Sequence, residues 1–217
     1  MEKNALVIGA TGLVGRELVQ LLAEESNYST VTVLTRRKSF NHPLIKEVVV
    51  DFSNLAAYKE EFAADDVFCC IGTTIKKAGS QAEMKKIDLE YPVEIASLAF
   101  EMGAKQLLAI SAIGADINSK IFYSKLKGEF ETSLRDIGYP SLTILRPSLL
   151  LGNRKEFRLG EKLSSYLLPP LHFLLVGGLR KYRGIKASSV AAAMSKLAEK
   201  NKNGVYILES DEIEKAA

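Results

Sequence analysis

The sequence contains few of the residues that build disulfide frameworks and metal centres. Its 217 residues include two cysteines and two histidines. Cys69 and Cys70 are adjacent in an apolar run, so they can supply neither a disulfide framework nor a four-ligand zinc site. His42 and His172 lie far apart and away from the cysteines, so no metal site is expected. The N-terminus has neither the basic segment nor the apolar segment of a signal peptide. Together with the low cysteine content, this predicts a cytoplasmic protein.

An excess of one charge and a long apolar run are also missing. The chain has 29 basic and 26 acidic residues, a net charge of +3, which gives no global field for nucleic acid or an anionic membrane. Residues 163–178 are markedly apolar, but prolines interrupt them and they are too short to span a bilayer. We therefore expect a small-molecule substrate, no nucleic-acid partner and no membrane span. Monomer and homodimer both remain open.

Short apolar segments alternate with amphipathic segments along the chain. This alternation predicts a doubly wound α/β fold, with helices on both faces of a parallel sheet. The expected strands are 5–9, 30–34, 47–50, 66–71, 105–110, 141–145 and 204–208, and the expected helices are 13–22, 83–102, 120–137 and 188–200. Pro92 is expected to bend or restart the helix over 83–102.

No repeat or linker divides the sequence, so we expect a single domain. Its core comprises residues 1–150 and 187–210, and residues 151–186 form a small cap on the substrate side. The alternatives for this segment are a helix and loop packed on the domain, or a segment that docks on a membrane surface.

Three glycines with G-x-x-G-x-x-G spacing lie between the first strand and the first helix. Gly9 permits a tight turn, Gly12 lets the backbone approach a pyrophosphate, and Gly15 allows close helix packing. The free N–H groups of the helix N-terminus would face the anion. The turn predicts a dinucleotide site that includes Gly9, Thr11, Gly12, Leu13, Val14 and Gly15; the alternative is a tight turn without a ligand. Because no Gly-Lys-Ser/Thr ending follows, a kinase or ATPase is disfavoured.

Basic residues follow the second predicted strand at Arg36, Arg37 and Lys38. NAD-binding folds place an acidic residue here, on the ribose hydroxyls. A carboxylate would repel a 2′-phosphate, whereas guanidinium groups bind it through charge-assisted hydrogen bonds. The sequence therefore favours NADP(H) over NAD(H), with a solvated basic turn as the alternative.

A tyrosine, a lysine and a serine carry the chemistry expected of the site. Tyr123 and Lys127 are four residues apart on one predicted helix face, and Ser111 follows a strand at the carboxyl edge of the sheet. A nearby ammonium favours a phenolate, so Tyr123 can exchange a proton with a substrate oxygen that Ser111 hydrogen-bonds. The same spacing recurs at Tyr182 and Lys186, but a glycine between them argues against a helix there.

These motifs resemble those of a known superfamily. The glycine turn, Ser111, Tyr123 with Lys127, and Leu-Arg-Pro at residues 145–147 occur in the order seen in short-chain dehydrogenases/reductases, in their atypical and extended branches. The resemblance covers nearly the whole chain. It is most specific to the Tat-interacting-protein-like atypical reductases, which are NADPH-binding Rossmann proteins of one domain, over residues 111–116, 123–129 and 144–152.

The resemblance implies further cofactor contacts. Asp51 and Phe52 would lie beside the adenine, and Lys127 would also hold the nicotinamide ribose. The segment after the fourth strand would line the cofactor, and the segment after Arg146 would flank the nicotinamide, through Cys70, Ile71, Gly72, Thr73, Pro147 and Leu149. Where many relatives carry an asparagine for a proton relay, this chain has Asp88, for which the alternative is an ordinary helix-surface carboxylate.

The leading hypothesis is an NADPH-dependent oxidoreductase that transfers a hydride to a carbonyl-type small molecule, with Tyr123 as general acid. A regulatory protein that binds NADPH with little or no turnover is the first alternative. An isomerase similar to nucleotide-sugar epimerases is the second, although 217 residues leave little room for a larger substrate domain.

Overall fold

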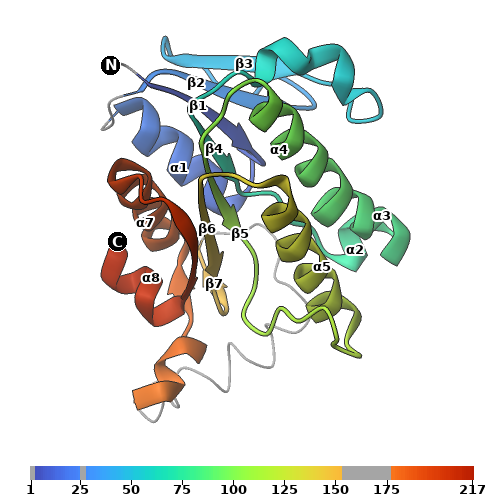
Figure 1. Ribbon diagram of the computed structural model, residues 1–217, viewed down its shortest axis with the longest axis vertical. Coiled ribbons are helices and arrows are strands. Elements are labelled where there is room, and N and C mark those ends of the chain that lie inside the picture. The colour runs from blue at the N-terminus through green and yellow to red at the C-terminus, as the bar shows by residue number, and fades with distance from the viewer. Residues whose placement is uncertain (1–2, 25–27, 153–176) are drawn as a thin grey trace.

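Within residues 3–24, 28–152 and 177–217, which the computed structural model describes, seven strands form one parallel sheet (Figure 1). Strand order changes direction between β1 and β4, which is where open α/β sheets bind ligands. The spatial order is β3 (Ile45–Val49), β2 (Tyr28–Thr35), β1 (Lys3–Ile8), β4 (Asp66–Cys69), β5 (Gln106–Ile110), β6 (Ser141–Arg146) and β9 (Gly204–Glu209). The prediction of a doubly wound fold is confirmed.

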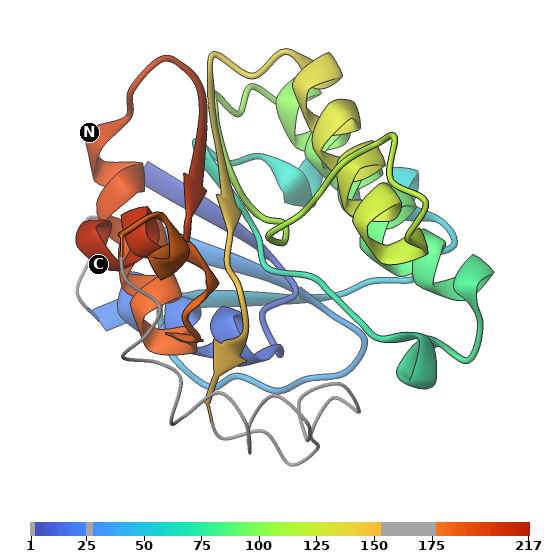
Figure 2. The same ribbon diagram turned by 90° about the horizontal axis from the view of Figure 1, so that it is seen from below.

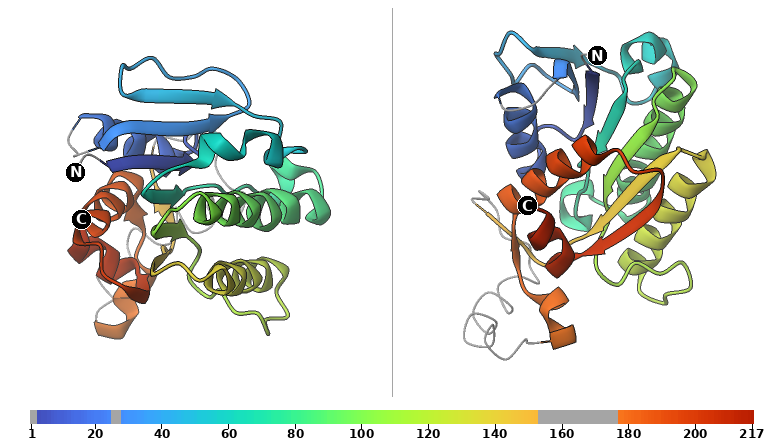
Figure 3. Two further views of the ribbon diagram at one scale, coloured as in Figure 1. Left: turned by 45° about the horizontal axis from the view of Figure 1, so that its top comes forward. Right: turned by 60° about the vertical axis from the view of Figure 1, so that its left-hand side comes forward.

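Helices cover both faces of this sheet (Figures 2 and 3). One face carries α1 (Leu13–Glu24), α7 (Ala187–Lys200) and α8 (Ser210–Ala216), and the other carries the 3₁₀ helix η1 (Leu55–Phe62), α2 (Ile75–Ala78), α3 (Gln81–Lys85), α4 (Tyr91–Glu101) and α5 (Phe122–Ile137). Side chains of β1 alternate between the two cores: Val7 packs with the first group, and Leu6 and Ile8 pack with the second. This is why the buried strands read as continuous apolar runs.

Several small elements have no clear signal in the sequence. These are η1, α8, a 3₁₀ helix η4 (Gly177–Tyr182), and a two-stranded parallel sheet of β7 (Leu150–Leu151) and β8 (Ile185–Lys186). Most of the expected cap over 151–186 lies outside the described residues, as do His172 and nearly all of the apolar stretch 163–178. None of the helices in the described ranges is both long and apolar enough to cross a membrane.

The helix expected over 83–102 is interrupted by a wider turn directly before Pro92. After α3, residues Lys86–Glu90 form a π-helical turn, and α4 then begins at Tyr91. Pro92 lies in the first turn of α4, where it has no N–H to donate to a carbonyl of the preceding π turn. The prediction of a helix that is bent or restarted at Pro92 therefore agrees with the structure to within one residue. A π turn has more residues than an α turn, and it rotates the following side chains relative to the preceding ones.

A buried ion pair joins α5 to β6. Arg146 donates from Nε and Nη2 to the two carboxylate oxygens of Glu131, at 2.8 and 2.6 Å. Glu131 is buried, whereas Arg146 is partly exposed. This bidentate ion pair holds the end of β6, and with it the following segment, against α5.

Glu131→Gln is expected to lower the free energy of unfolding by about 1 to 3 kcal/mol, because it removes a charged hydrogen-bond acceptor from a buried position. Urea unfolding followed by circular dichroism would measure the loss. Asp136→Asn, at an exposed position on the same helix, is the control and should change stability by less than about 0.5 kcal/mol. Equal stability of the two variants would show that the pair contributes little.

Candidate active site

The glycine turn connects β1 to α1 through backbone contacts that exclude side chains. Gly9 has a φ of +81°, and a Cβ there would lie 2.6 Å from the backbone nitrogen of Ile71. A Cβ at Gly15 would lie 2.3 Å from the carbonyl oxygen of Gly9. The N–H groups in the first turn of α1 have no acceptor within the helix. These contacts explain the glycine spacing and leave backbone donors at the carboxyl edge of the sheet.

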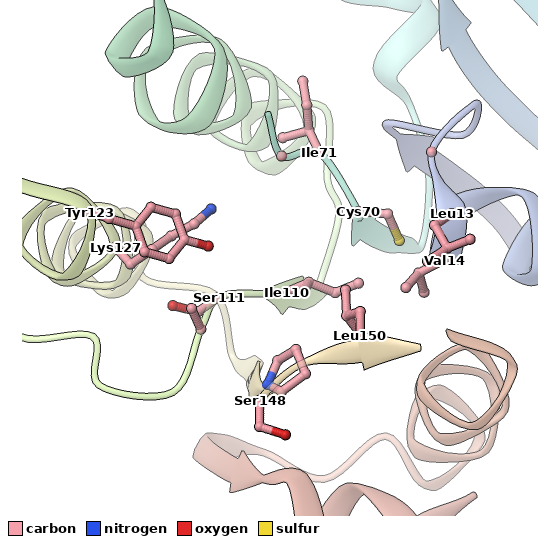
Figure 4. A pocket seen from close by; sticks show the side chains of 14 residues that line it. Leu13, Val14, Cys70, Ile71, Ile110, Ser111, Tyr123, Lys127, Ser148 and Leu150 are labelled. Carbon is pink, nitrogen blue, oxygen red and sulfur yellow. The ribbon is translucent and has the colours of Figure 1, made fainter. Parts of the chain in front are cut away.

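A pocket lies at this edge, where the strand order changes direction (Figure 4). Five segments of the chain contribute to it: the glycine turn, the segments after β4, β5 and β6, and one face of α5. The lining residues are Gly12, Leu13, Val14, Cys70, Ile71, Gly72, Ile110, Ser111, Ala112, Tyr123, Lys127, Pro147, Ser148 and Leu150. The structure therefore brings the serine, tyrosine and lysine into one pocket with part of the glycine turn.

Ser111 presents a buried hydroxyl without a partner. Its side chain lies on the pocket wall, the residue is 4% exposed, and its Oγ has no hydrogen-bond partner among the described residues. Leaving such a group unpaired costs about 1 to 3 kcal/mol. Figure 4 shows Ser111 near the ends of Tyr123 and Lys127 in the same pocket. A ligand oxygen bound here would satisfy the serine hydroxyl.

Lys127 is a buried ammonium group held by an acidic partner. Burial lowers its pKa, but the Asp88 carboxylate and the Tyr123 phenol act in the opposite direction, and the net effect is a raised pKa. The Nζ atom of Lys127 lies 3.2 Å from Oδ2 of Asp88 and 5.2 Å from the centre of the Phe130 ring. Lys127 therefore stays protonated at neutral pH.

Asp88 lies in the interior, so the interpretation of it as a helix-surface carboxylate is wrong. It is 1% exposed, on the π turn. Its Oδ1 accepts a hydrogen bond of 2.7 Å from the backbone N–H of Thr73, in the segment that follows β4. The sequence pattern placed this residue on a helix but gave no sign of its burial.

The basic residues after β2 lie outside the pocket, at the same edge of the sheet. Arg36 and Arg37 directly follow β2, are exposed and make no ion pair with another described residue. Asp51 and Phe52 follow the neighbouring β3; hydrogen bonds from Ser53 lower the pKa of Asp51. The other predicted residues that do not line the pocket are Gly9, Thr11, Gly15, Thr73 and Leu149.

Two contacts that position the site were not predicted. A Cβ at Gly128 would lie 2.1 Å from the backbone nitrogen of Ile117, so this glycine lets the loop after β5 lie against α5. A glycine inside a helical pattern is a weak signal of such a contact. Ser148 receives a hydrogen-bond partner from α8, because its N–H donates to Oγ of Ser210 at 2.7 Å. These two residues are 62 positions apart, and no local pattern links them.

The cysteine in the pocket is poorly suited to be a nucleophile. Burial raises the pKa of the Cys70 thiol well above its ordinary value and raises that of Cys69 to about 11. Because the thiolate is the reactive form, neither side chain is activated at neutral pH. The pocket therefore offers hydroxyl and ammonium chemistry rather than thiol chemistry.

The fold and site define the class of protein. A glycine turn after β1, at the point where strand order changes, is the nucleotide-binding element of Rossmann folds. A serine, a tyrosine and a lysine beside that element correspond to the atypical short-chain dehydrogenases/reductases. Residues 5–133 match the model of the NAD dependent epimerase/dehydratase family, and the chain belongs to this family.

Curated relatives support this membership over most of the chain. Protein HTATIP2 of Rattus norvegicus is 35% identical over 169 residues, which cover 75% of this chain and 69% of the rat protein. Protein FMP52, mitochondrial, of Eremothecium gossypii is 33% identical over 216 residues, which cover 97% of this chain and 95% of that protein. Because such a relative is named mitochondrial, the prediction of a cytoplasmic location is contradicted and is not retained.

Solved structures share the fold. The Bordetella bronchiseptica enzyme WbmG, in a crystal structure with NAD, aligns with a TM-score of 0.67 over 96% of this chain and 73% of WbmG. The two sequences are 13% identical, so this likeness concerns the fold alone.

Proposed function

We propose that the chain is an NADP(H)-dependent oxidoreductase that reduces the carbonyl group of a small molecule. The observation that supports this most strongly is the meeting of Ser111, Tyr123 and Lys127 in the pocket that the glycine turn lines. Membership in a family of nucleotide-dependent enzymes agrees with it. The preference for NADP(H) and the assignment as a carbonyl reduction go beyond family membership and are part of this proposal.

The residues present fit a dinucleotide. The glycines form a cradle that side chains would fill, and the backbone donors of α1 suit a pyrophosphate. Arg36 and Arg37 would bind a 2′-phosphate, and the segments after β4 and β6 would enclose the nicotinamide end. When bound, the reduced nicotinamide would supply the hydride.

Three side chains of the pocket would bind the substrate oxygen and supply its proton. Ser111 Oγ donates a hydrogen bond to the carbonyl oxygen and so polarises it. Tyr123 transfers its hydroxyl proton to this oxygen as negative charge develops there. Lys127, which stays protonated, stabilises the tyrosinate that remains. The product is an alcohol, and solvent reprotonates Tyr123.

The direct test is to mix the purified protein and NADPH with a panel of aldehydes and ketones and to follow NADPH absorbance. We expect consumption of NADPH with at least one carbonyl compound and formation of the matching alcohol. Tight NADPH binding without consumption across the panel would instead favour a regulatory protein. Interconversion of UDP-sugars without net cofactor turnover would favour an epimerase.

A further inference from the structure

Asp88 joins two parts of the pocket with one carboxylate. Oδ1 accepts the hydrogen bond from the N–H of Thr73, next to the lining residues Ile71 and Gly72. Oδ2 lies 3.2 Å from Nζ of Lys127 on α5. The pair is almost completely enclosed, since the side chains of Lys127 and Asp88 are 3% and 1% exposed. Movement of this carboxylate would therefore disturb both the wall after β4 and the lysine.

Asp88 lies on the buried side of the π turn. In this turn Asp88 and Leu89 are buried, whereas Lys86 and Glu90 are exposed. The turn thus presents one acidic side chain to Lys127 and another to solvent. This contrast provides a matched pair for experiments, because Asp88 and Glu90 are two residues apart on the same element.

The charge on Asp88 offsets the cost of burying Lys127. A buried lysine without a partner loses its proton readily. The titratable groups that act on Lys127 are Asp88 from the π turn, Tyr123 from α5 and Cys69 from β4. Cys69 stays protonated at neutral pH because burial raises the pKa of its thiol to about 11. Among the described residues, Asp88 is therefore the anion that faces the ammonium.

We propose that Asp88 is a positioning residue that holds Lys127 in the pocket as an ammonium ion and fixes the segment after β4 through the N–H of Thr73. This role deepens the proposed function and rests on it where turnover is concerned. Asparagine at this position would keep an acceptor for the N–H of Thr73 but would carry no charge, and its amide NH2 would replace the oxygen that faces Lys127. Alanine would remove both the charge and the acceptor.

The variants Asp88→Asn and Asp88→Ala therefore separate charge from geometry, with Glu90→Gln as the control. The charge is read by NMR titration of protein with isotope-labelled lysine Cε atoms, and Lys127→Arg assigns the Lys127 signal. In the wild-type protein Lys127 should titrate above an ordinary lysine. In Asp88→Asn the midpoint should fall by about one pH unit or more, because burial then dominates. Glu90→Gln should leave it unchanged.

This measurement needs no turnover, so it is independent of the proposed function. An unchanged Lys127 midpoint in folded Asp88→Asn would overturn the proposal. A wild-type Lys127 that titrates below an ordinary lysine would also overturn it. This second result needs only the wild-type protein, so it decides the question even where the variant does not fold.

The geometric role is read by NADPH affinity. Asp88→Ala should weaken NADPH binding about tenfold, the size of one lost hydrogen bond, whereas Asp88→Asn should stay near wild type. Equal weakening in both variants would overturn the role of the Thr73 contact. If the wild type reduces carbonyls, the alkaline limb of its pH profile should shift in Asp88→Asn with the Lys127 midpoint. Absence of turnover in the wild type would count against the proposed function alone.

Discussion

Replacing Tyr123 by phenylalanine is expected to lower kcat/KM for carbonyl reduction by about 10²- to 10⁴-fold, the range of a general-acid contribution. The variant keeps the ring that lines the pocket and loses only the hydroxyl that would supply the proton. NADPH affinity should change little, because the glycine turn and the basic residues after β2 are untouched. Initial rates and a fluorescence titration with NADPH would separate the two effects.

The chain offers a matched control in its second Tyr-x-x-x-Lys pattern. Tyr182 is 49% exposed at the end of η4, and Lys186 lies in β8, so the two do not share a helix face. Tyr182→Phe should leave the reduction rate near that of wild type. Wild-type rates in Tyr123→Phe would remove its role as general acid.

The cofactor preference should depend on the two arginines after β2. In the double variant Arg36→Gln and Arg37→Gln, NADPH affinity is expected to fall about 10- to 100-fold, because charge-assisted hydrogen bonds to the 2′-phosphate are lost. NADH affinity should stay nearly constant, since NADH has no such phosphate. Titrations of both cofactors by fluorescence, at low and high salt, would measure the change and its electrostatic part.

A second double variant controls for the loss of two positive charges. Lys200→Gln with Lys202→Gln removes the same charge from exposed positions at the end of α7 and before β9. These positions lie at the amino edge of the sheet, away from the glycine turn, so NADPH affinity should be unchanged. Equal wild-type affinities for NADPH and NADH would contradict the assignment of a 2′-phosphate site.

Much of the fold could be predicted because its signals are local. The buried parallel strands require apolar runs, and β1 supplies one from Ala5 to Ile8 that ends at the glycine turn. Pro92 indicated that the helix is interrupted here, but the π turn itself could not be predicted, because Lys86–Glu90 continues the helical pattern on both sides. Helix α8 is too short for its apolar residues to show a clear helical period. It also follows β9, an edge strand whose apolar residues are largely exposed, so the pattern before it does not mark its start.

The site divides in the same way. The glycine turn and the Tyr123–Lys127 spacing are short-range patterns, and the order of the strands brings them together. The partners of Ser148 and the burial of Asp88 depend on tertiary packing, and acidic residues in helices more often face solvent. The sequence could therefore identify the side chains that meet in the pocket but could not identify the contacts that hold them.

The π turn makes the pocket depend on residue count as well as on residue type. Each residue in an α-helix advances the side-chain direction by about 100°. Deleting one residue other than Asp88 between Met84 and Tyr91 would convert the turn to regular helix while keeping every motif of the sequence. Either α3 or the carboxylate of Asp88 would then change its orientation relative to α5. In a homologue whose shorter turn directs this carboxylate away from α5, the buried ammonium group of the lysine would need another anion beside it.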